Sequence, residues 1–408
     1  MIFFGDKSIS HRALILASLC NGQSIIKNIS KGEDVLTTIE CLKLCGINVE
    51  VIDEKIFVYG GTLNQPKKEL NCNNSGTTAR LLLGLLAGQK ISATIIGDSS
   101  LSSRPMERVT IPLGLMGANI ENNKGKLPLK IETNYLIGID YFQKVSSAQV
   151  KSALLFAALG ASGTTKIGEK YLSRDHTEIM MKYLGIDLIQ ENNSVLIKKN
   201  NIKLNSFEIT IPGDPSTASF FAAAALLLKK EIILKNILLN PTRIGFFQLI
   251  QKMGAQIEYL NVKKSFGEKV GDIKVIPSTL KSIEISKSMI PSIIDELPII
   301  SILASHADGT TVLSGAKELR YKECDRIHAI CYNLKNMGVN IKERSDGFII
   351  SKFNQFVGTD IKTFNDHRIA MAFSIAGLVS DGKNNLDNMN CVKISCPNFY
   401  QLLEELIN

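Results

Sequence analysis

The chain of 408 residues contains no tryptophan, and aromatic residues make up only 6% of it. Proteins that bind single-stranded nucleic acid stack the bases on aromatic side chains, and such side chains are scarce here. The net charge of +8 is spread along the chain without a long basic block, whereas nucleic-acid binding normally calls for a dense basic stripe. The sequence therefore predicts no nucleic-acid partner and, at most, small anionic ligands.

Long hydrophobic runs are also absent. The longest apolar run extends from Phe220 to Leu228, and a membrane-spanning helix needs about 20 apolar residues. The first residues do not combine a basic region with a signal-type hydrophobic stretch. We therefore expect no membrane association and a cytoplasmic location.

Spacings typical of metal and redox sites are missing. The eight cysteines include no C-x-x-C pair, and several lie in apolar helical patterns, so they are interpreted as reduced, buried thiols. The five histidines form no H-x-x-x-H pair and have no cysteine at ligand spacing, which makes a metal site improbable. No G-x-S-x-G or G-x-G-x-x-G motif is present, which weighs against a hydrolase triad and a dinucleotide site. We expect no metal and no cofactor.

A repeated unit organises the chain, whose length favours two domains. Five apolar segments reach a glycine and continue as an alternating strand pattern, at Gly46, Gly117, Gly185, Gly254 and Gly338. These glycines are 71, 68, 69 and 84 residues apart, and a near-constant period indicates a repeated supersecondary unit. A second series of helices, each with a polar start, is expected at 7–19, 75–87, 147–159, 215–228, 292–304 and 366–378. We predict six units of two helices with strands between them.

The two halves resemble each other at one point. Gly213-Asp214-Pro215-Ser216 repeats the pattern of Gly5-Asp6-Lys7-Ser8. The first strand, Met1 to Phe4, is too short to be a domain and is expected to complete the C-terminal half. We predict domains at 6–212 and at 1–5 plus 213–408, with the site in the cleft between them.

The stretch from Gly5 to Arg12 combines a glycine, a lysine and serines ahead of an apolar helix. Backbone N–H groups, a helix N-terminus and a cation together favour an anion. The first glycine of a Walker motif is missing, so a nucleotide site is only weakly indicated. On these residues alone, an ordinary capped helix with a solvated basic end is an equal alternative.

Similar polar clusters lie at other expected helix starts. Serine, glycine and arginine so placed can hold phosphate or carboxylate, although each cluster taken singly is better explained as a cap or a surface ion pair. Their repetition on one scaffold strengthens the anion hypothesis. The clusters are Lys7-Ser8 with Arg12, Asn74 to Thr77 with Arg80, Ser102 to Pro105, Ser146 to Gln149, Ser173-Arg174, Arg320 to Arg326, and Asn365 to Arg368.

Two carboxylates stand out against this cationic background. Asp295 lies among apolar residues that could raise its pKa towards the range of a general base, and Glu323 lies beside Lys322 and three residues before Arg326. A helix cap for Asp295 and an ion pair with Arg326 for Glu323 remain the simpler interpretations at this point.

Taken together, these motifs resemble the 5-enolpyruvylshikimate-3-phosphate synthase family. They occur in the family's order over nearly the whole chain, and in combination they are highly specific. The motifs are Gly5 to Arg12, Asn74 to Arg80, Arg104 to Met106, Ser147 to Ala153, Ser173 to Glu178, Asp295-Glu296, Lys322 to Arg326, and Asn365 to Arg368.

This resemblance implies an α/β fold of two inside-out domains, each with three βαβαββ repeats. It implies transfer of the enolpyruvyl group of phosphoenolpyruvate to the 5-hydroxyl of shikimate 3-phosphate with release of phosphate, without a metal. Asp295 is then the base at the hydroxyl and Glu323 the acid at the methylene, and Lys7 contacts both substrates. Shikimate 3-phosphate is assigned to Lys7, Ser8, Arg12, Ser147, Gln149, Ser173, Asp295 and Lys322, and phosphoenolpyruvate to Lys7, Gly76, Arg104, Gln149, Arg326 and Arg368. We expect a monomer.

The alternative within the same fold is a UDP-N-acetylglucosamine enolpyruvyl transferase. Members of that family usually carry a cysteine shortly before an Arg-Pro pair and a Lys-Asn near the start. Here Leu101-Ser102-Ser103 precedes Arg104, and Lys7 is followed by Ser8. A non-catalytic anion-binding protein is a second alternative, and the presence of Asp295 and Glu323 among the arginines argues against it.

Overall fold

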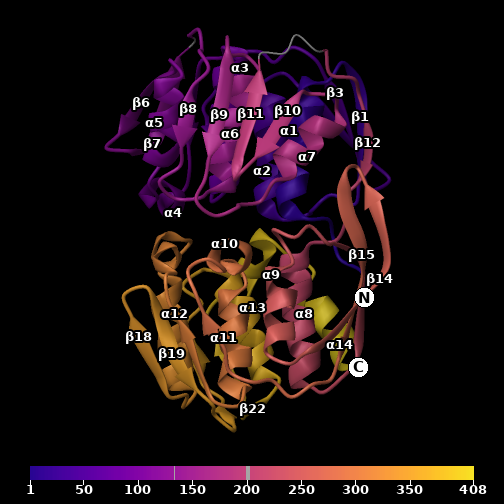
Figure 1. Cartoon of the computed structure of the whole chain (residues 1–408), viewed down its shortest axis with the longest axis vertical. Coiled ribbons are helices and arrows are strands. Elements are labelled where there is room, and N and C mark those ends of the chain that lie inside the picture. The colour runs from indigo at the N-terminus through magenta and orange to yellow at the C-terminus, as the bar shows by residue number, and fades with distance from the viewer. Residues whose placement is uncertain (133, 199–202) are drawn as a thin grey trace. The chain divides into compact units, whose positions relative to one another are not determined.

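The computed structural model describes residues 1–132, 134–198 and 203–408. It divides into two compact units (Figure 1), which are treated separately below. We call them the N-terminal unit (Gly5–Ile211 with Ser265–Glu268) and the C-terminal unit (Met1–Phe4, Pro212–Lys264 and Lys269–Asn408).

Three repeats make up the N-terminal unit, and each contributes a four-stranded sheet in which a parallel strand pair is extended by antiparallel strands. The first contains α1 (Lys7–Leu19), β1 (Gly22–Lys27), α2 (Glu33–Leu44), β2 (Asn48–Ile52), β3 (Lys55–Gly60) and β12 (Glu208–Thr210). The second contains β4 (Leu70–Asn71), α3 (Gly76–Gln89), β5 (Ala93–Ile96), α4 (Ser99–Ser103), α5 (Glu107–Leu115), β6 (Asn119–Asn123) and β7 (Lys126–Glu132). The third contains β8 (Asp140–Phe142), α6 (Ala148–Ala158), β9 (Thr164–Gly168), α7 (His176–Tyr183), β10 (Leu188–Glu191) and β11 (Ser194–Lys198).

The C-terminal unit repeats this scheme with shorter strands towards its end. Its first repeat contains α8 (Pro215–Leu227), β13 (Ile232–Leu238), α9 (Gly245–Lys252), β14 (Gln256–Ser265) and β15 (Glu268–Ile276). The next contains β16 (Glu284–Ile285), α10 (Ile290–Ile293), α11 (Leu297–His306), β17 (Thr310–Leu313), η1 (Lys317–Tyr321), α12 (Arg326–Asn336), β18 (Ile341–Arg344) and β19 (Gly347–Ser351). The last contains β20 (Phe356–Val357), β21 (Asp360–Ile361), α13 (His367–Gly377), β22 (Ser380–Asp381), β23 (Asn385–Leu386), η2 (Asn390–Ile394) and α14 (Phe399–Ile407).

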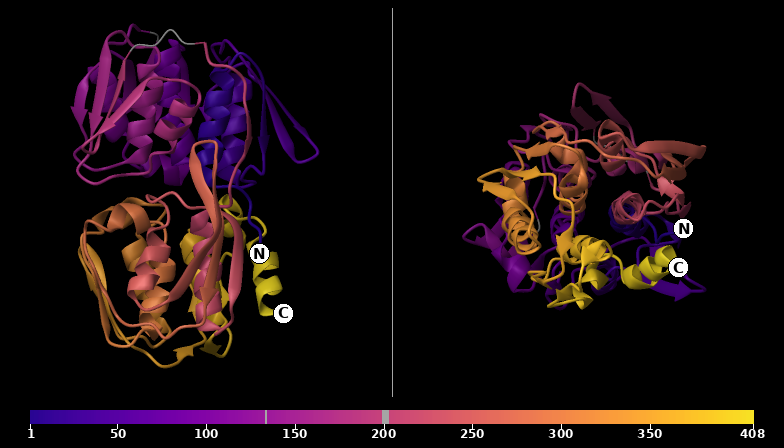
Figure 2. Two further views of the ribbon diagram at one scale, coloured as in Figure 1. Left: turned by 45° about the vertical axis from the view of Figure 1, so that its right-hand side comes forward. Right: turned by 90° about the horizontal axis from the view of Figure 1, so that it is seen from below.

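Helices form the interior of each unit. Eleven consecutive residues of α1, from Ser8 to Ser18, are buried, and α8 is apolar on all sides, as expected of a helix inside a core. Strands such as β7 alternate exposed and buried residues, so they lie at the periphery with one face towards the helices (Figures 1 and 2). The predicted mixed α/β class is confirmed, and the inside-out repeats are consistent with it.

The glycine pattern has a direct structural counterpart. Each of the five repeated glycines has a positive φ, from 85° at Gly46 to 104° at Gly254, and lies two residues beyond the end of a helix. A side chain is disfavoured in this left-handed conformation, which explains why glycine ends these helices.

Each unit has close contacts at its bounds. Gly5 lies in the N-terminal unit and approaches Asn28 closely, since a Cβ on Gly5 would overlap the Asn28 carbonyl oxygen. Residues 265–268, at the tip of the β14–β15 hairpin, also belong to that unit, where Phe266 packs on Tyr183 and Phe207. Residues 1–4 lie in the C-terminal unit, with Ile2 bridged in parallel to Lys235. The domain bounds expected from the sequence stay a prediction. The expected cleft between the domains stays a prediction.

The helix expected at 292–304 is interrupted. The short helix α10 ends at Ile293 and α11 begins at Leu297, with Pro298 in its first turn. Proline disfavours a helical conformation in the residue before it, so a break at this point is natural. Asp295 therefore lies in the turn between two helices and not within one.

All eight cysteines are free thiols, and every one except the partly exposed Cys324 is buried. Among the residues that the structure describes, no helix has both the length and the apolar character to cross a bilayer.

Candidate active site

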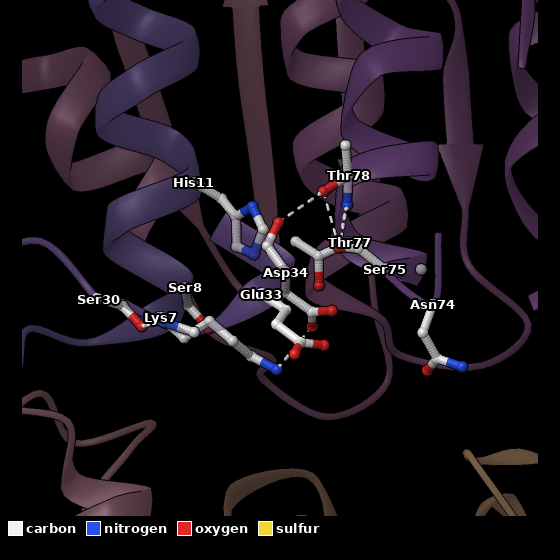
Figure 3. Close-up of polar contacts among 12 residues, drawn as sticks. Lys7, Ser8, His11, Ser30, Glu33, Asp34, Asn74, Ser75, Thr77 and Thr78 are labelled. Carbon is white, nitrogen blue, oxygen red and sulfur yellow. Dashed lines mark hydrogen bonds and ion pairs between the residues drawn. The ribbon is translucent and has the colours of Figure 1, made fainter. Parts of the chain in front are cut away.

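The start of α1 is built as the sequence suggests. Asp6 caps the helix, its carboxylate accepting from the N–H of Ile9 at 2.8 Å. Lys7 in the first turn places its Nζ 2.9 Å from Oδ2 of Asp34, in the first turn of α2 (Figure 3). Both side chains are mostly buried, with exposures of 17% and 11%. Lys7 is thus held by a carboxylate that the sequence analysis did not identify.

Ser8 and Arg12 follow on the same helix. The Ser8 hydroxyl accepts from Nη1 of Arg174 at 3.1 Å, which brings the Ser173 loop to the start of α1. Arg12 is 2% exposed and donates to Thr177 and Ser152 at 2.7 Å each, and to the Ser8 carbonyl at 2.8 Å. In this structure Arg12 ties α1 to α6 and α7, so its assignment as a substrate ligand stays a prediction beside an evident packing role.

The residues expected to hold phosphoenolpyruvate in this unit surround the start of α3. Arg80 donates through Nη1 to Oε1 of Gln149 at 2.8 Å, and Gln149 donates to the Thr77 hydroxyl at 2.9 Å. Arg104 donates through Nη2 to Oδ1 of Asn74 at 2.7 Å. Gly76 begins α3 between the two guanidinium groups: a Cβ built on it would lie 2.7 Å from Nη1 of Arg80 and 3.5 Å from Nη1 of Arg104.

Gly76→Ala is expected to raise the KM for phosphoenolpyruvate about tenfold, the effect of distorting one charged hydrogen bond. The added methyl group pushes Arg80 away from Gly76 and disturbs its bond to Gln149. Gly114→Ala is the matched control, because a Cβ at Gly114 on α5 would meet nothing within 4 Å. Steady-state kinetics of both variants checks this, and an unchanged KM in Gly76→Ala would contradict it.

The serines expected to hold shikimate 3-phosphate lie at the start of α6 and in the loop before α7. Ser147 caps α6, its side chain accepting from the N–H of Val150 at 3.4 Å. Ser173 donates both its N–H and its hydroxyl to Glu169, at 2.9 and 2.6 Å. The structure therefore brings the helix starts of α1, α3 and α6 and the Ser173 loop together through Arg12, Gln149 and Arg174.

His11 lies beneath this cluster, fully buried, with Nδ1 2.7 Å from the Thr38 hydroxyl. Thr38 in turn contacts Thr78. Thr78 is bonded to Ser75 and to the carbonyl of Asp34 (Figure 3). Burial and then the nearby Lys7 and Arg12 lower the pKa of His11 well below its usual value. His11 is therefore neutral in the folded chain, and we interpret it as part of the packing beneath Lys7.

A pH dependence of stability follows from His11. Below about pH 6.5 an unfolded histidine takes up a proton that the buried, neutral His11 does not, so acid favours unfolding by up to about 1.4 kcal/mol per pH unit. His11→Gln is expected to remove this part of the slope, measured as the change in unfolding free energy in urea between pH 7 and pH 5. Equal slopes in His11→Gln and wild type would contradict the prediction.

In the C-terminal unit, the turn before α11 gathers three cations around Asp295. Lys322 Nζ lies 3.4 Å and Arg326 Nη1 3.6 Å from Oδ1 of Asp295, and Arg368 Nη2 lies 3.8 Å from Oδ2. Arg368 also donates to the backbone carbonyl of Asp295 at 3.0 Å. The expected apolar setting of Asp295 is therefore wrong, because residues distant in sequence supply charges. Lys322, Arg326 and Arg368 therefore place positive charge on both oxygens of this carboxylate.

Glu323 and Asp366 complete this cluster around Arg326, whose side chain is 1% exposed. Glu323 Oε2 lies 2.6 Å from Nη2 of Arg326, so the simple ion-pair interpretation of Glu323 describes this structure. Asp366 is fully buried and accepts two hydrogen bonds from Arg326, one from Nε at 2.7 Å and one from Nη2 at 3.2 Å. The pair is therefore bidentate. Burial opposes the charge of Arg326, but Asp366, Glu323 and Asp295 outweigh it and raise the pKa.

The two clusters have complementary chemistry. The N-terminal unit offers helix starts, hydroxyls and Lys7, which suit anions. The C-terminal unit offers two carboxylates beside three cations, which suits proton transfer next to a bound anion. Among the described residues, no group of three or more His, Cys, Asp or Glu is placed to hold a metal ion.

Three supporting carboxylates were missed by the sequence analysis as functional residues: Asp34, Glu169 and Asp366. Asp366 was visible as a member of a polar cluster, and Asp34 as an acid in the first turn of a helix. Glu169 has a local partner, Ser173, four residues later in the same loop, whereas Lys151 comes from α6 and could not be found from the local sequence.

Comparisons with known proteins agree on one family. A family model described as EPSP synthase (3-phosphoshikimate 1-carboxyvinyltransferase) matches residues 2–403. A 3-phosphoshikimate 1-carboxyvinyltransferase of Thermodesulfovibrio yellowstonii is 46% identical, covering 98% of this chain and 95% of the relative. One of Aquifex aeolicus is 44% identical, covering 97% and 94%. The EPSP synthase structure from Acinetobacter baumannii superposes with a TM-score of 0.88 at 37% identity, covering 100% of this chain and 95% of the other.

These matches span nearly the whole chain, and they confirm the resemblance inferred from the motifs. The relatives carry the name of the shikimate enzyme, so the UDP-N-acetylglucosamine alternative is not favoured. The chain belongs to the EPSP synthase family, the 3-phosphoshikimate 1-carboxyvinyltransferases.

Proposed function

We propose that the chain transfers the enolpyruvyl group of phosphoenolpyruvate to the 5-hydroxyl of shikimate 3-phosphate, a step on the route to chorismate and the aromatic amino acids. The observation that carries the mechanism is the cluster of Asp295 and Glu323 with Lys322, Arg326 and Arg368. It supplies a base, an acid and cations for an anionic substrate within a few ångströms. We also propose that the protein acts in the cytoplasm as a monomer, without nucleic-acid or membrane partners.

In the first half of the reaction, Asp295 takes the proton of the 5-hydroxyl as its oxygen bonds to C2 of phosphoenolpyruvate. Glu323 enters the step protonated, outside the ion pair with Arg326 that it forms in the free protein. It gives this proton to the methylene carbon, which becomes a methyl group in a tetrahedral intermediate. In the second half the methyl group returns a proton to Glu323, the double bond reforms, and the C2–O bond to phosphate breaks. The departing phosphate takes the proton held by Asp295, so both carboxyl groups return to their starting states.

Binding of the substrates is assigned to the two clusters together. Shikimate 3-phosphate is held by Lys7, Ser8, Arg12, Ser147, Gln149, Ser173, Asp295 and Lys322, and phosphoenolpyruvate by Lys7, Gly76, Arg104, Gln149, Arg326 and Arg368. Each substrate carries a phosphate and a carboxylate, and the lysines and arginines neutralise them. Lys7, at a helix N-terminus, is the cation assigned to both.

The role of Glu323 is tested by running the reaction in D₂O and recording the vinyl protons of the product by ¹H NMR. Protonation of the methylene places one solvent deuterium in the methyl group of the intermediate, so the vinyl group of the product should become partly deuterated. Glu323→Gln should lose turnover and deuterium incorporation together. Product without deuterium in the wild type would contradict a mechanism through a methyl intermediate.

A further inference from the structure

Glu169 lies at the centre of a buried polar cluster in the N-terminal unit that the proposed chemistry does not use. Its carboxylate is 3% exposed and lies next to Lys151, which is 4% exposed. Lys151 Nζ is 2.8 Å from Oε1 of Glu169 and 2.8 Å from Oε1 of Glu178. Buried charges require such pairing, because an isolated one would be strongly unfavourable.

Both oxygens of Glu169 reach the Ser173 loop. Oε1 accepts from the N–H of Ser173 at 2.9 Å as well as from Lys151, and Oε2 accepts from the Ser173 hydroxyl at 2.6 Å. Lys151 also donates to the Ser173 carbonyl at 3.4 Å. The backbone and the side chain of Ser173 are therefore fixed by one buried ion pair.

The same carboxylate is connected to the start of α6. Gln143 is 2% exposed and donates through Nε2 to Oε2 of Glu169 at 3.5 Å. The Gln143 Oε1 accepts from the N–H of Ser147 at 3.1 Å. A single buried residue thus contacts Ser173 directly and Ser147 through one amide.

We propose that Glu169 is a positioning residue that holds Ser147 and Ser173 in the geometry needed to bind the phosphate of shikimate 3-phosphate. The proposal rests on the assignment of these two serines as ligands of that substrate. Ligands held by packing and by outer hydrogen bonds bind more tightly than loosely held ones, because less freedom is lost on binding.

The hydrogen bonds also define what must change when the phosphate binds. A serine hydroxyl has one hydrogen, and in this structure that of Ser173 points to Glu169. It turns to the phosphate on binding, while the bond between the Ser173 N–H and Oε1 keeps the loop in place. Gln143 still donates to Oε2 afterwards, so the buried carboxylate keeps a partner on each oxygen.

The test is the dissociation constant of shikimate 3-phosphate, measured by calorimetry without phosphoenolpyruvate, together with the KM values of both substrates. Glu169→Ala is expected to weaken binding of shikimate 3-phosphate about tenfold or more, as loss of hydrogen bonds to a charged group implies. The KM for phosphoenolpyruvate should change less than about threefold, because the loss is confined to the shikimate 3-phosphate ligands. Glu169→Gln should bind more tightly than Glu169→Ala, because its amide can accept from the Ser173 N–H and donate to the Ser173 oxygen, although it loses the bond from Gln143.

Glu178→Ala is the matched control, because Glu178 is also buried and shares Lys151 at the same distance. If Glu178→Ala weakens binding as much as Glu169→Ala, the effect is a general loss of packing and the proposal is overturned. Ser173→Ala distinguishes the positioning role of Glu169 from the assignment of Ser173 as a ligand of shikimate 3-phosphate. If Ser173→Ala weakens binding and Glu169→Ala does not, the positioning role is wrong; if Ser173→Ala binds normally, the ligand assignment beneath it is wrong.

Discussion

Replacing Asp295 with asparagine is expected to lower kcat by about 10²–10⁴-fold, the usual contribution of a general base. Asparagine has nearly the same shape but cannot take the proton of the 5-hydroxyl. Substrate binding should persist, because Lys322, Arg326 and Arg368 keep their positions, and removal of one negative charge among them favours the anionic phosphoenolpyruvate. The KM for phosphoenolpyruvate is therefore expected to stay the same or to fall.

The matched control is Asp308→Asn in the same unit. Asp308 is also paired with a lysine, Lys352, at 2.6 Å, but its side chain is 51% exposed. That variant should keep wild-type turnover within about twofold, because exposed ion pairs contribute little. The kcat of Asp295→Ala is a second measurement, in a variant that has no side-chain amide at this position. Turnover near the wild-type value in both Asp295 variants would exclude a role as base.

Asp366 is the position where we expect the largest loss of stability. In Asp366→Asn the buried guanidinium of Arg326 loses the negative charge of Asp366 as a partner. Because breaking a buried ion pair is strongly destabilising, the free energy of unfolding should fall by about 3–5 kcal/mol. Urea unfolding should show a lower midpoint with little change in its slope. The KM for phosphoenolpyruvate should rise as well, because Asp366 anchors Arg326 and accepts from the N–H of Arg368 at 2.9 Å.

Asp325 offers a close control for this prediction. It also caps a helix, accepting from the N–H of His328, and it also pairs with an arginine, Arg320 at 2.6 Å, but its side chain is 38% exposed. Because asparagine is a good helix cap, Asp325→Asn is expected to change the unfolding free energy by less than about 1 kcal/mol. Similar losses in Asp325→Asn and Asp366→Asn would show that burial of the Arg326 pair is not the cause.

The repeat and the helix starts could be predicted from the sequence because both depend on local chemistry. Each of these glycines ends a helix in the left-handed conformation that disfavours a side chain, so Gly46 and its four equivalents marked the repeat. Helix α1 begins at Lys7 and ends at Leu19, as predicted, because the Asp6 cap and the apolar run that follows are contiguous in the chain.

The surroundings of Asp295 could not be predicted in the same way. Its sequence neighbours Ile293 and Ile294 are apolar, whereas the charges that face it come from Lys322 and Arg368, in other elements. Only packing of the whole unit brings these groups within 4 Å of the carboxylate. Local hydrophobicity was therefore a poor guide to the electrostatic environment.

The supporting carboxylates illustrate the same limit. Glu169 is followed by Lys170, which by sequence alone suggests an exposed pair, yet its partners are Lys151 on α6 and the Ser173 loop. The family motifs include Lys151 and Asp366 without marking them as supporting residues, and Glu169 lies outside the motifs.

The most direct test of the account is phosphate release from phosphoenolpyruvate by the purified protein, measured with shikimate 3-phosphate and, separately, with UDP-N-acetylglucosamine as the acceptor. We predict release that depends on shikimate 3-phosphate and matches the amount of enolpyruvyl ether formed, with none above background for the sugar nucleotide. Release with UDP-N-acetylglucosamine alone would contradict the account.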